Sequence, residues 1–124
     1  INVEAAVLYE VVGRRVDQLM ADGLLLEVQA LAAAGHAHAP SVSQAIGYKE
    51  LLAFLDGRMT LEDAVAAIKQ ATRRLAKRQR TWFRRDERIR WVEATDLHQR
   101  RLEGSLDEAA SAEALLQRAL ALLA

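Results

Sequence analysis

Apolar residues recur at steps of three and four along most of this chain, and this spacing constrains its fold more than any other feature. The first such series is Val7, Leu8, Val11, Val12, Leu19 and Met20. Side chains at these intervals share one face of an α-helix, which they bury against neighbouring elements. Proline occurs once and β-branched residues are scattered, so extended strands are disfavoured. The sequence therefore predicts an all-α fold of about five helices, in a single segment that covers residues 1–124.

The first helices are bounded by glycine and by polar capping residues. A helical hairpin is expected over residues 1–35, with Gly23 at the C-cap of its first helix because glycine readily adopts a left-handed conformation. Residues 36–43 contain the only proline and predict a loop. Ser41 or Ser43 is then expected to cap the next helix.

Two capping-box patterns predict the start of the remaining helices. Thr60-Leu-Glu-Asp63 opens a long helix over residues 61–83, and Ser105-Leu-Asp-Glu108 opens a C-terminal helix over residues 105–124. Between them, alternating apolar residues leave room for a short strand near residues 88–92.

The net charge of zero conceals a strong local asymmetry. Residues 69–90 contain ten basic and two acidic side chains, whereas the rest of the chain contains seven basic and fifteen acidic ones. Such clustering bears on partners rather than on fold, and it makes a polyanion the leading candidate partner.

On a helical wheel the long basic helix has cationic and apolar sides. Lys69, Arg73, Lys77, Arg80 and Arg84 share one arc, Arg74, Arg78 and Arg85 form a second stripe, and Ile68, Ala71, Leu75, Gln79 and Trp82 lie opposite. A row of cations matches the spacing of nucleic-acid phosphates, and a solvated helix face is the alternative interpretation. Trp82 is expected in the core, with stacking on an unpaired base as the alternative; Phe83 suits either role.

Several classes of site are disfavoured by what the sequence lacks. It contains no G-x-x-x-x-G-K-[ST] cradle for phosphates, no Ser/His/Asp pattern, and no carboxylate spaced with His36, His38 or His98 to bind a metal. No apolar run approaches the roughly 20 residues of a membrane span. The absence of cysteine fits a reducing compartment.

Three runs of residues resemble the C-terminal part of the tRNA dimethylallyltransferase family. They are SQAIGYKEL at residues 43–51, TRRLAKRQRTWFR at residues 72–84 and IRW at residues 89–91. The RVDQLM run at residues 15–20 is similar to a preceding family helix. The resemblance implies a piece of a longer cytoplasmic enzyme, monomeric when intact, whose P-loop α/β core lies upstream.

That family transfers a dimethylallyl group from its diphosphate to N6 of adenosine 37, beside the tRNA anticodon. The resemblance implies that Mg²⁺, the diphosphate and the catalytic base belong to the missing core, with no catalytic residue in this segment. It implies that helices within residues 43–84 contact the anticodon stem-loop, and that Arg15 lies near the substrate channel. The implied tRNA-binding residues are Gln44, Ala45, Ile46, Gly47, Tyr48, Lys49, Lys77, Arg78, Gln79, Arg80, Thr81, Trp82, Phe83 and Arg84. The alternative function is a stand-alone helical adaptor whose basic helix binds an acidic protein or an anionic surface.

Overall fold

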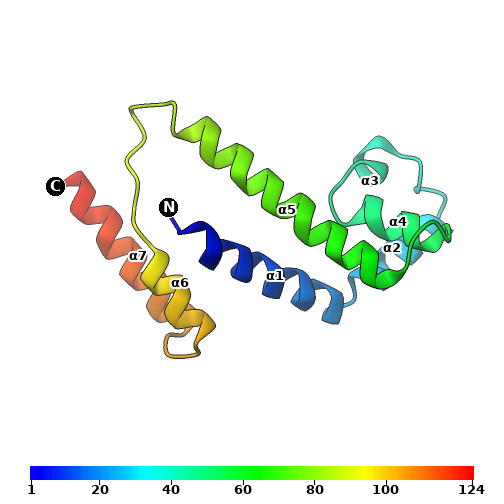
Figure 1. Ribbon diagram of the computed structural model, residues 1–124, viewed down its shortest axis with the longest axis horizontal. Coiled ribbons are helices and arrows are strands. Elements are labelled where there is room, and N and C mark those ends of the chain that lie inside the picture. The colour runs from blue at the N-terminus through cyan, green and yellow to red at the C-terminus, as the bar shows by residue number, and fades with distance from the viewer. The chain divides into compact units, whose positions relative to one another are not determined.

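The computed structural model describes residues 1–124 and consists of helices joined by turns and short loops (Figure 1). The helices are α1 (Ala5–Ala21), α2 (Leu24–Ala33), α3 (Pro40–Ser43), α4 (Tyr48–Leu55), α5 (Leu61–Phe83), α6 (Thr95–Leu102) and α7 (Glu108–Leu123). No sheet forms, so the all-α prediction is confirmed, although the short helices α3 and α6 were not expected. None of the helices combines the length and the apolar character that crossing a bilayer requires.

The chain divides into two compact units. The central unit comprises Val12–Arg78, and the terminal unit combines Ile1–Val11 with Gln79–Ala124. Both α1 and α5 therefore contribute residues to each unit.

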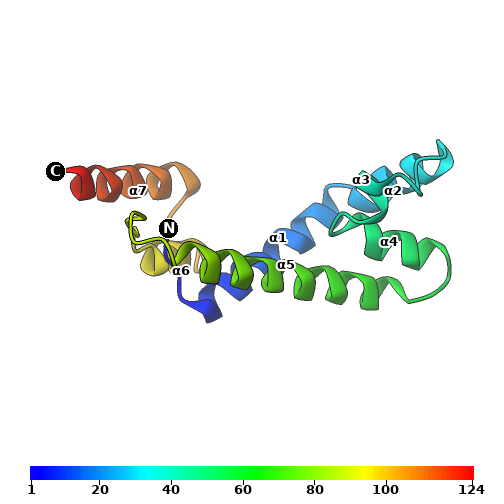
Figure 2. The same cartoon turned by 90° about the horizontal axis from the view of Figure 1, so that it is seen from above.

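The central unit is built on an apolar core to which four helices contribute. Its buried residues are Val16 from α1, Val28 from α2, Leu51 and Leu52 from α4, and Ala64 and Ile68 from α5. Helix α4 packs against both α2 and α3, and Figures 1 and 2 show these three helices gathered into one cluster. Leu51 is completely inaccessible to solvent, which places α4 at the centre of this core.

The terminal unit buries fewer apolar side chains. Val3, Ala94 and Leu97 are its buried apolar residues. Helices α6 and α7 pack against each other. The backbone N–H of Glu4 donates to the Thr95 hydroxyl (2.9 Å), so the N-terminal residues are tied to the start of α6.

An ion pair links α6 to α7 within the terminal unit. The Arg118 guanidinium donates to both carboxylate oxygens of Asp96 (2.7 and 2.8 Å) and to the backbone carbonyl of Glu93 (2.6 Å). Hydrogen bonding to Arg118 lowers the pKa of the Asp96 carboxyl to about 2.

The predicted ends of α1 and α5 are confirmed by their cap geometry. Gly23 has φ +103° between α1 and α2, a left-handed conformation that favours glycine. The Thr60 hydroxyl accepts a hydrogen bond from the backbone N–H of Asp63 (3.1 Å), so Thr60 caps α5 as its motif predicts.

The prediction of a serine cap before α4 was wrong. Ser41 and Ser43 lie inside α3, which begins at Pro40 because the fixed φ of proline suits the first position of a helix. A turn follows, and α4 begins one residue after Gly47.

The short strand expected near residues 88–92 does not form. Glu93 makes one isolated parallel bridge with Asn2: the Asn2 N–H donates to the Val92 carbonyl (2.7 Å), and the Ala94 N–H donates to the Asn2 carbonyl (2.9 Å). Because only one bridge forms and α6 begins directly after it, no ladder of paired residues develops.

The second capping motif places the N-cap of α7 two residues too early, at Ser105. Asp107 is the N-cap, and its carboxylate accepts from the Ala110 N–H (2.7 Å). The Ser105 hydroxyl and the Ser105 backbone N–H instead both donate to the carbonyl of Arg100 (3.1 and 2.9 Å), near the end of α6.

Candidate nucleic-acid interface

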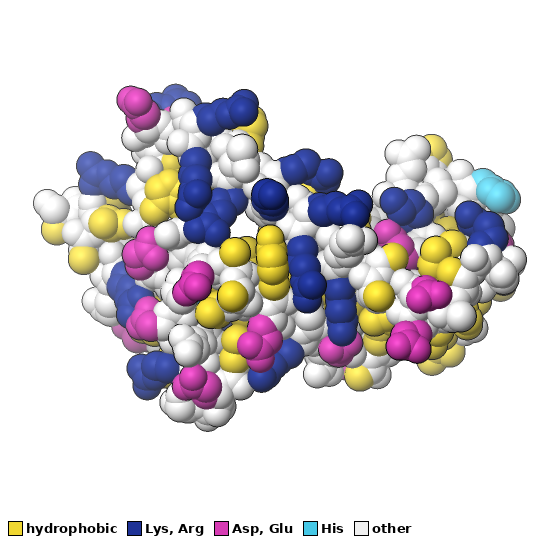
Figure 3. All heavy atoms as spheres, viewed as in Figure 1, with side chains coloured by type: hydrophobic (Ala, Val, Ile, Leu, Met, Phe, Trp, Pro, Cys, Tyr) yellow, Lys and Arg dark blue, Asp and Glu magenta, His cyan; other side chains and the backbone are white.

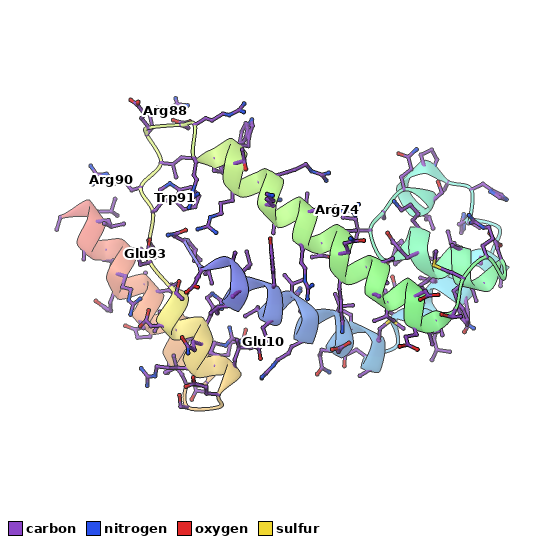
Figure 4. All side chains as sticks on the ribbon, viewed as in Figure 1. Glu10, Arg74, Arg88, Arg90, Trp91 and Glu93 are labelled. Carbon is purple, nitrogen blue, oxygen red and sulfur yellow. The ribbon has the colours of Figure 1, made fainter.

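The cations of α5 fall into an exposed set and a half-buried set. Arg74, Lys77, Arg78, Arg84 and Arg85 are exposed on α5 or directly after it, and Lys69, Arg73 and Arg80 are half-buried. Figure 3 shows lysine and arginine side chains along α5, and Figure 4 labels Arg74 among them. The guanidinium groups of Arg74, Arg78, Arg84 and Arg85 have no ion-pair partner, so they are available to an external anion.

The half-buried cations are engaged within their own units. In the central unit the Lys69 ammonium lies 2.7 Å from the Asp17 carboxylate. In the terminal unit Arg80 Nη2 donates to the Asn2 side-chain carbonyl (3.0 Å). These contacts hold the Lys69 and Arg80 side chains to α1 and the N-terminal residues, which reduces their freedom to reach a ligand.

The prediction that Leu75, Gln79 and Trp82 lie on the packed side of α5 was wrong, because all three are exposed. Ala64 and Ile68 are buried in the first half of the helix, and in the last ten residues only Ala76 and Arg80 are half-buried, so these positions are separated by multiples of four residues. Four residues turn an α-helix by slightly more than one revolution, so this stripe drifts around the helix along its length.

The exposure of the Trp82 side chain follows from that drift. Trp82 lies two residues after Arg80, on the opposite side of the helix, and its side chain is 68% exposed. Phe83 is also exposed, and the two rings meet edge to face with centroids 4.9 Å apart. The prediction that Trp82 is a core residue was wrong.

The segment after α5 carries a further ion pair. The Arg88 guanidinium grips the Asp86 carboxylate through Nε (2.8 Å) and Nη2 (2.7 Å), and this hydrogen bonding lowers the pKa of Asp86. Trp82, Arg85, Asp86, Glu87 and Arg88 line a shallow surface hollow. Figure 4 shows Arg88 and Arg90 on this segment.

A second candidate contact region is the turn at residues 44–47. Gly47 is buried and has φ +97°, and its N–H donates to the Glu50 carboxylate (2.8 Å). Glu50 is itself only 5% exposed, so this hydrogen bond fixes the turn from inside the protein. Gln44 and Ile46 are exposed.

Tyr48 and Lys49 follow this turn on the first residues of α4. The Tyr48 hydroxyl donates to the Glu27 carboxylate on α2, and this hydrogen bond raises the pKa of Tyr48. The Lys49 ammonium is exposed and lies 3.8 Å from Glu50. Tyr48 is therefore tied to α2 while Lys49 remains open to solvent.

The two carboxylates that support this turn were missed by sequence reasoning. Glu50 stands three residues after Gly47, the spacing of the acidic arm of a capping box, so a capping box with glycine at the N-cap is its local sequence signal. Glu27 lies 21 residues from Tyr48, and no local pattern connects them.

The candidate residues are distributed over both units. Gln44–Lys49, Lys77 and Arg78 belong to the central unit, and residues 79–84 belong to the terminal unit. Arg15 is exposed on the part of α1 that belongs to the central unit. No group of three or more His, Asp or Glu side chains is arranged to hold a metal ion.

Comparison with known proteins gives one consistent result. The family model described as IPP transferase matches residues 1–86. The chain is 48% identical over 93 residues to tRNA dimethylallyltransferase 1 of Citrifermentans bemidjiense, a match that covers 75% of this chain and 30% of the relative. It is 44% identical over 94 residues to tRNA dimethylallyltransferase of Carboxydothermus hydrogenoformans, covering 76% and 30% respectively.

Solved structures give the same answer. The full-length tRNA isopentenylpyrophosphate transferase of Bacillus halodurans superposes with a TM-score of 0.73 and 37% identity, covering 98% of this chain and 40% of that one. A tRNA isopentenylpyrophosphate transferase of Staphylococcus epidermidis superposes with a TM-score of 0.69 and 40% identity, covering 73% of this chain and 30% of that one. The chain thus spans about a third of the length of the proteins that it matches.

Proposed function

Because the chain belongs to the IPP transferase family, we propose that it is the tRNA-contacting part of a tRNA dimethylallyltransferase. The complete enzyme would move a dimethylallyl group from dimethylallyl diphosphate to N6 of adenosine 37, next to the anticodon. The residues of this chain would bind and orient the anticodon stem-loop, and the chemical step would belong to the rest of the enzyme.

The observation that carries the proposal is the row of exposed, unpaired arginines along α5 and directly after it. Arg74 and Arg78 lie in one stripe of α5, and Arg84 follows the last residue of the helix in the neighbouring arc; none of them has an anionic partner within the protein. Arginine binds phosphate through paired N–H donors, and successive arginines along a helix match successive phosphates. A solvated structural helix gains nothing from such a row, because its like charges repel each other.

The turn at residues 44–47 supports the same function by a different route. Its backbone is held by the buried Glu50 carboxylate, so Gln44 and Lys49 are presented from a defined framework. A fixed turn loses little conformational entropy on binding, which suits it for recognising the shape of an RNA loop.

The transfer step itself is not assigned to these residues. The donors present do not fit a Mg²⁺ site, because no carboxylate cluster is formed and the three histidines do not converge with acidic groups. Exposed Arg15 is proposed to lie beside the substrate channel of the complete enzyme, as the resemblance implies. The chain alone is expected to produce no prenylated adenosine when incubated with tRNA and dimethylallyl diphosphate.

A salt-titrated binding experiment tests the tRNA assignment. A fluorescent anticodon stem-loop is titrated with the chain and with its Arg78→Ala and Arg84→Ala variants, over a range of KCl concentrations. Each substitution is expected to weaken binding and to reduce the slope of log K against log salt by about 0.7–0.9. Their melting temperatures should stay unchanged because both side chains are exposed.

Arg58→Ala provides the matched control. Arg58 is an exposed arginine that pairs with Asp56 (3.1 Å) and lies outside the row, so its loss removes one positive charge at another place. An equal weakening by all three substitutions would reduce the interaction to overall charge and contradict the proposal. Binding to polyglutamate or to anionic vesicles as tight as to the stem-loop would support the adaptor function instead.

A further inference from the structure

Helix α7 has two apolar sides, and only one of them packs within the terminal unit. Ser111 is 2% exposed and Arg118 binds Asp96, so the side that carries Ser111 and Arg118 faces α6 (Figure 1). The side turned away from them is open to solvent and consists of Ala109, Ala112, Leu116, Leu120 and Leu123. The exposed fractions of its three leucines are 52%, 49% and 76%. Leaving three leucines of one helix in water is unfavourable, which indicates that another surface covers them.

The spacing of this open side is that of a seam between two helices. Apolar residues follow one another at alternating steps of three and four, with Leu120 beside them: Ala109, Ala112, Leu116, Ala119 and Leu123. This heptad spacing lets the side chains of one helix enter the spaces between those of a second helix. Over the 16 residues of α7 the seam is about 24 Å long. The open side of α7 therefore fits a second helix with the same kind of stripe.

The sizes of the side chains along the seam match a second, antiparallel copy of α7. The small residues Ala109 and Ala112 lie in the first half of the helix, and Leu120 and Leu123 lie in the second half. In an antiparallel pair centred on Leu116, the alanines of one copy face the leucines of the other, so small and large side chains alternate. In a parallel pair alanine faces alanine and leucine faces leucine, which leaves a gap between the helices at one end.

The charges that flank the seam favour the same arrangement. Glu108 and Glu113 stand on either side of it, and the one basic residue of α7, Arg118, is held by Asp96 on the α6 side. A parallel pair would bring Glu108 of each copy against Glu113 of the other, at the flanking positions where like charges repel. In the antiparallel pair each glutamate faces the leucine-rich end of the other helix, so the carboxylates of the two copies stay apart.

We propose that α7 is a self-association surface through which two copies of this chain pair, with their α7 helices antiparallel and Leu116 of one copy against Leu116 of the other. The two-fold axis at Leu116 makes the surface self-complementary, as a closed dimer requires. One helix pair is small beside a standard interface of about 800 Å² per partner, so the dimer is expected to dissociate in the micromolar range. The family model matches residues 1–86, and the monomeric state that the resemblance implies is inferred from residues before α7.

Sedimentation equilibrium of the chain measures this association directly. The parent chain is expected to pass from monomer to dimer between about 1 and 300 μM. Leu116→Glu and Leu116→Lys each place two like charges at the centre of the seam, and each is expected to weaken association about tenfold or more. Leu26→Glu is the matched control, because Leu26 is 71% exposed on α2 and lies outside the seam. Circular dichroism checks that every variant keeps its helices.

An equimolar mixture of the Leu116→Glu and Leu116→Lys variants tests whether residue 116 meets its own counterpart. The carboxylate and the ammonium attract each other in the mixed pair, so the mixture is expected to recover the dimer that neither variant forms alone. A mixture that stays monomeric while the parent chain dimerises would overturn the pairing of α7 about Leu116.

Single cysteines report on the orientation, since the chain contains none of its own. In the antiparallel pair position 112 of one copy lies beside position 120 of the other. Mild oxidation of mixed Ala112→Cys and Leu120→Cys variants is therefore expected to link the two variants to each other faster than either links to itself. Faster linking of Ala112→Cys to itself would indicate a parallel pair and contradict the inference.

The concentration dependence separates this surface from the proposed function. A parent chain that stays monomeric at every concentration would overturn self-association and assign the open side of α7 to a different polypeptide segment. Binding of the anticodon stem-loop, measured with the Arg78→Ala and Arg84→Ala variants, would be unaffected by that outcome. At about 1 μM the chain is expected to be monomeric, so the stability of Leu116 variants measured there reports on the folded monomer.

Discussion

The two compact units are stabilised by different kinds of contact. The central unit buries side chains from α1, α2, α4 and α5 in one apolar cluster around Leu51. The terminal unit buries three apolar residues and depends more on polar links, among them the Asp96–Arg118 pair and the hydrogen bond from Arg80 to Asn2. The comparison teaches that the central unit should respond to loss of apolar volume, and the terminal unit to pH and salt.

Leu51→Ala should show the largest effect on folding. The substitution opens a cavity at a completely buried site of the central unit, which lowers the free energy of unfolding by about 2–5 kcal/mol. Leu116→Ala, which shortens an exposed side chain of α7, should change it by less than about 0.5 kcal/mol. Urea denaturation followed by circular dichroism measures both. Equal changes in the two variants would mean that the buried cluster does not dominate the stability of the central unit.

Glu50→Ala should have the next largest effect. It leaves the buried Gly47 N–H without an acceptor and lowers the free energy of unfolding by about 1–3 kcal/mol. Glu50→Gln keeps a carbonyl oxygen at the same place and should retain most of the stability. If Gln and Ala destabilise equally in urea titrations, the Gly47 hydrogen bond is not what stabilises the turn.

The Asp96–Arg118 pair should make the terminal unit sensitive to acid. The pKa of the Asp96 carboxyl is lowered from 3.8 to about 2 in the folded state. The contribution of the pair to the free energy of unfolding is therefore complete above pH 4 and is lost as the pH falls toward 2. Because the two side chains are 57% and 37% exposed, solvent screening reduces this contribution to about 1 kcal/mol or less.

In the Asp96→Asn variant, the melting temperature should therefore fall less between pH 4 and pH 2 than it does in the parent chain. Asp86→Asn is the control, since Asp86 pairs with Arg88 only two residues away and links no two helices. We expect its melting temperatures to follow those of the parent chain. A full acid transition retained in Asp96→Asn would show that the pair does not stabilise the packing of α6 on α7.

Arg80→Ala should have the smallest effect on stability. It removes the hydrogen bond to Asn2 and lowers the free energy of unfolding by about 0.5 kcal/mol, the lower end of the range for one hydrogen bond. Arg78→Ala removes a side chain with no partner and should leave stability unchanged. The order of the two effects should reverse for binding, so that Arg78→Ala weakens binding to the stem-loop more than Arg80→Ala does. If Arg80→Ala had the larger effect on both melting and binding, half-buried and exposed cations would not have different roles.

Local signals explain which helices were predicted. The ends of α1 and α5 are set by Gly23 and Thr60, whose effects act on backbone groups within three or four residues. The short helices α3 and α6 carry few apolar residues and no such pattern. Helix α6 depends on burial of Leu97 and on an ion pair to Arg118, which is 22 residues from Asp96, so its own eight residues do not specify it.

The sequence by itself determined that the chain is helical, where its long helices begin, and that its cations gather on α5, because these properties depend on neighbours along the chain. Tertiary structure decided which side of α5 is open. Helical periodicity sets the angle between two side chains, but the direction of the core is set by elements far away in the sequence. Trp82 is exposed and Arg80 is half-buried for this reason, since the buried stripe drifts around α5 as it passes from one unit to the other.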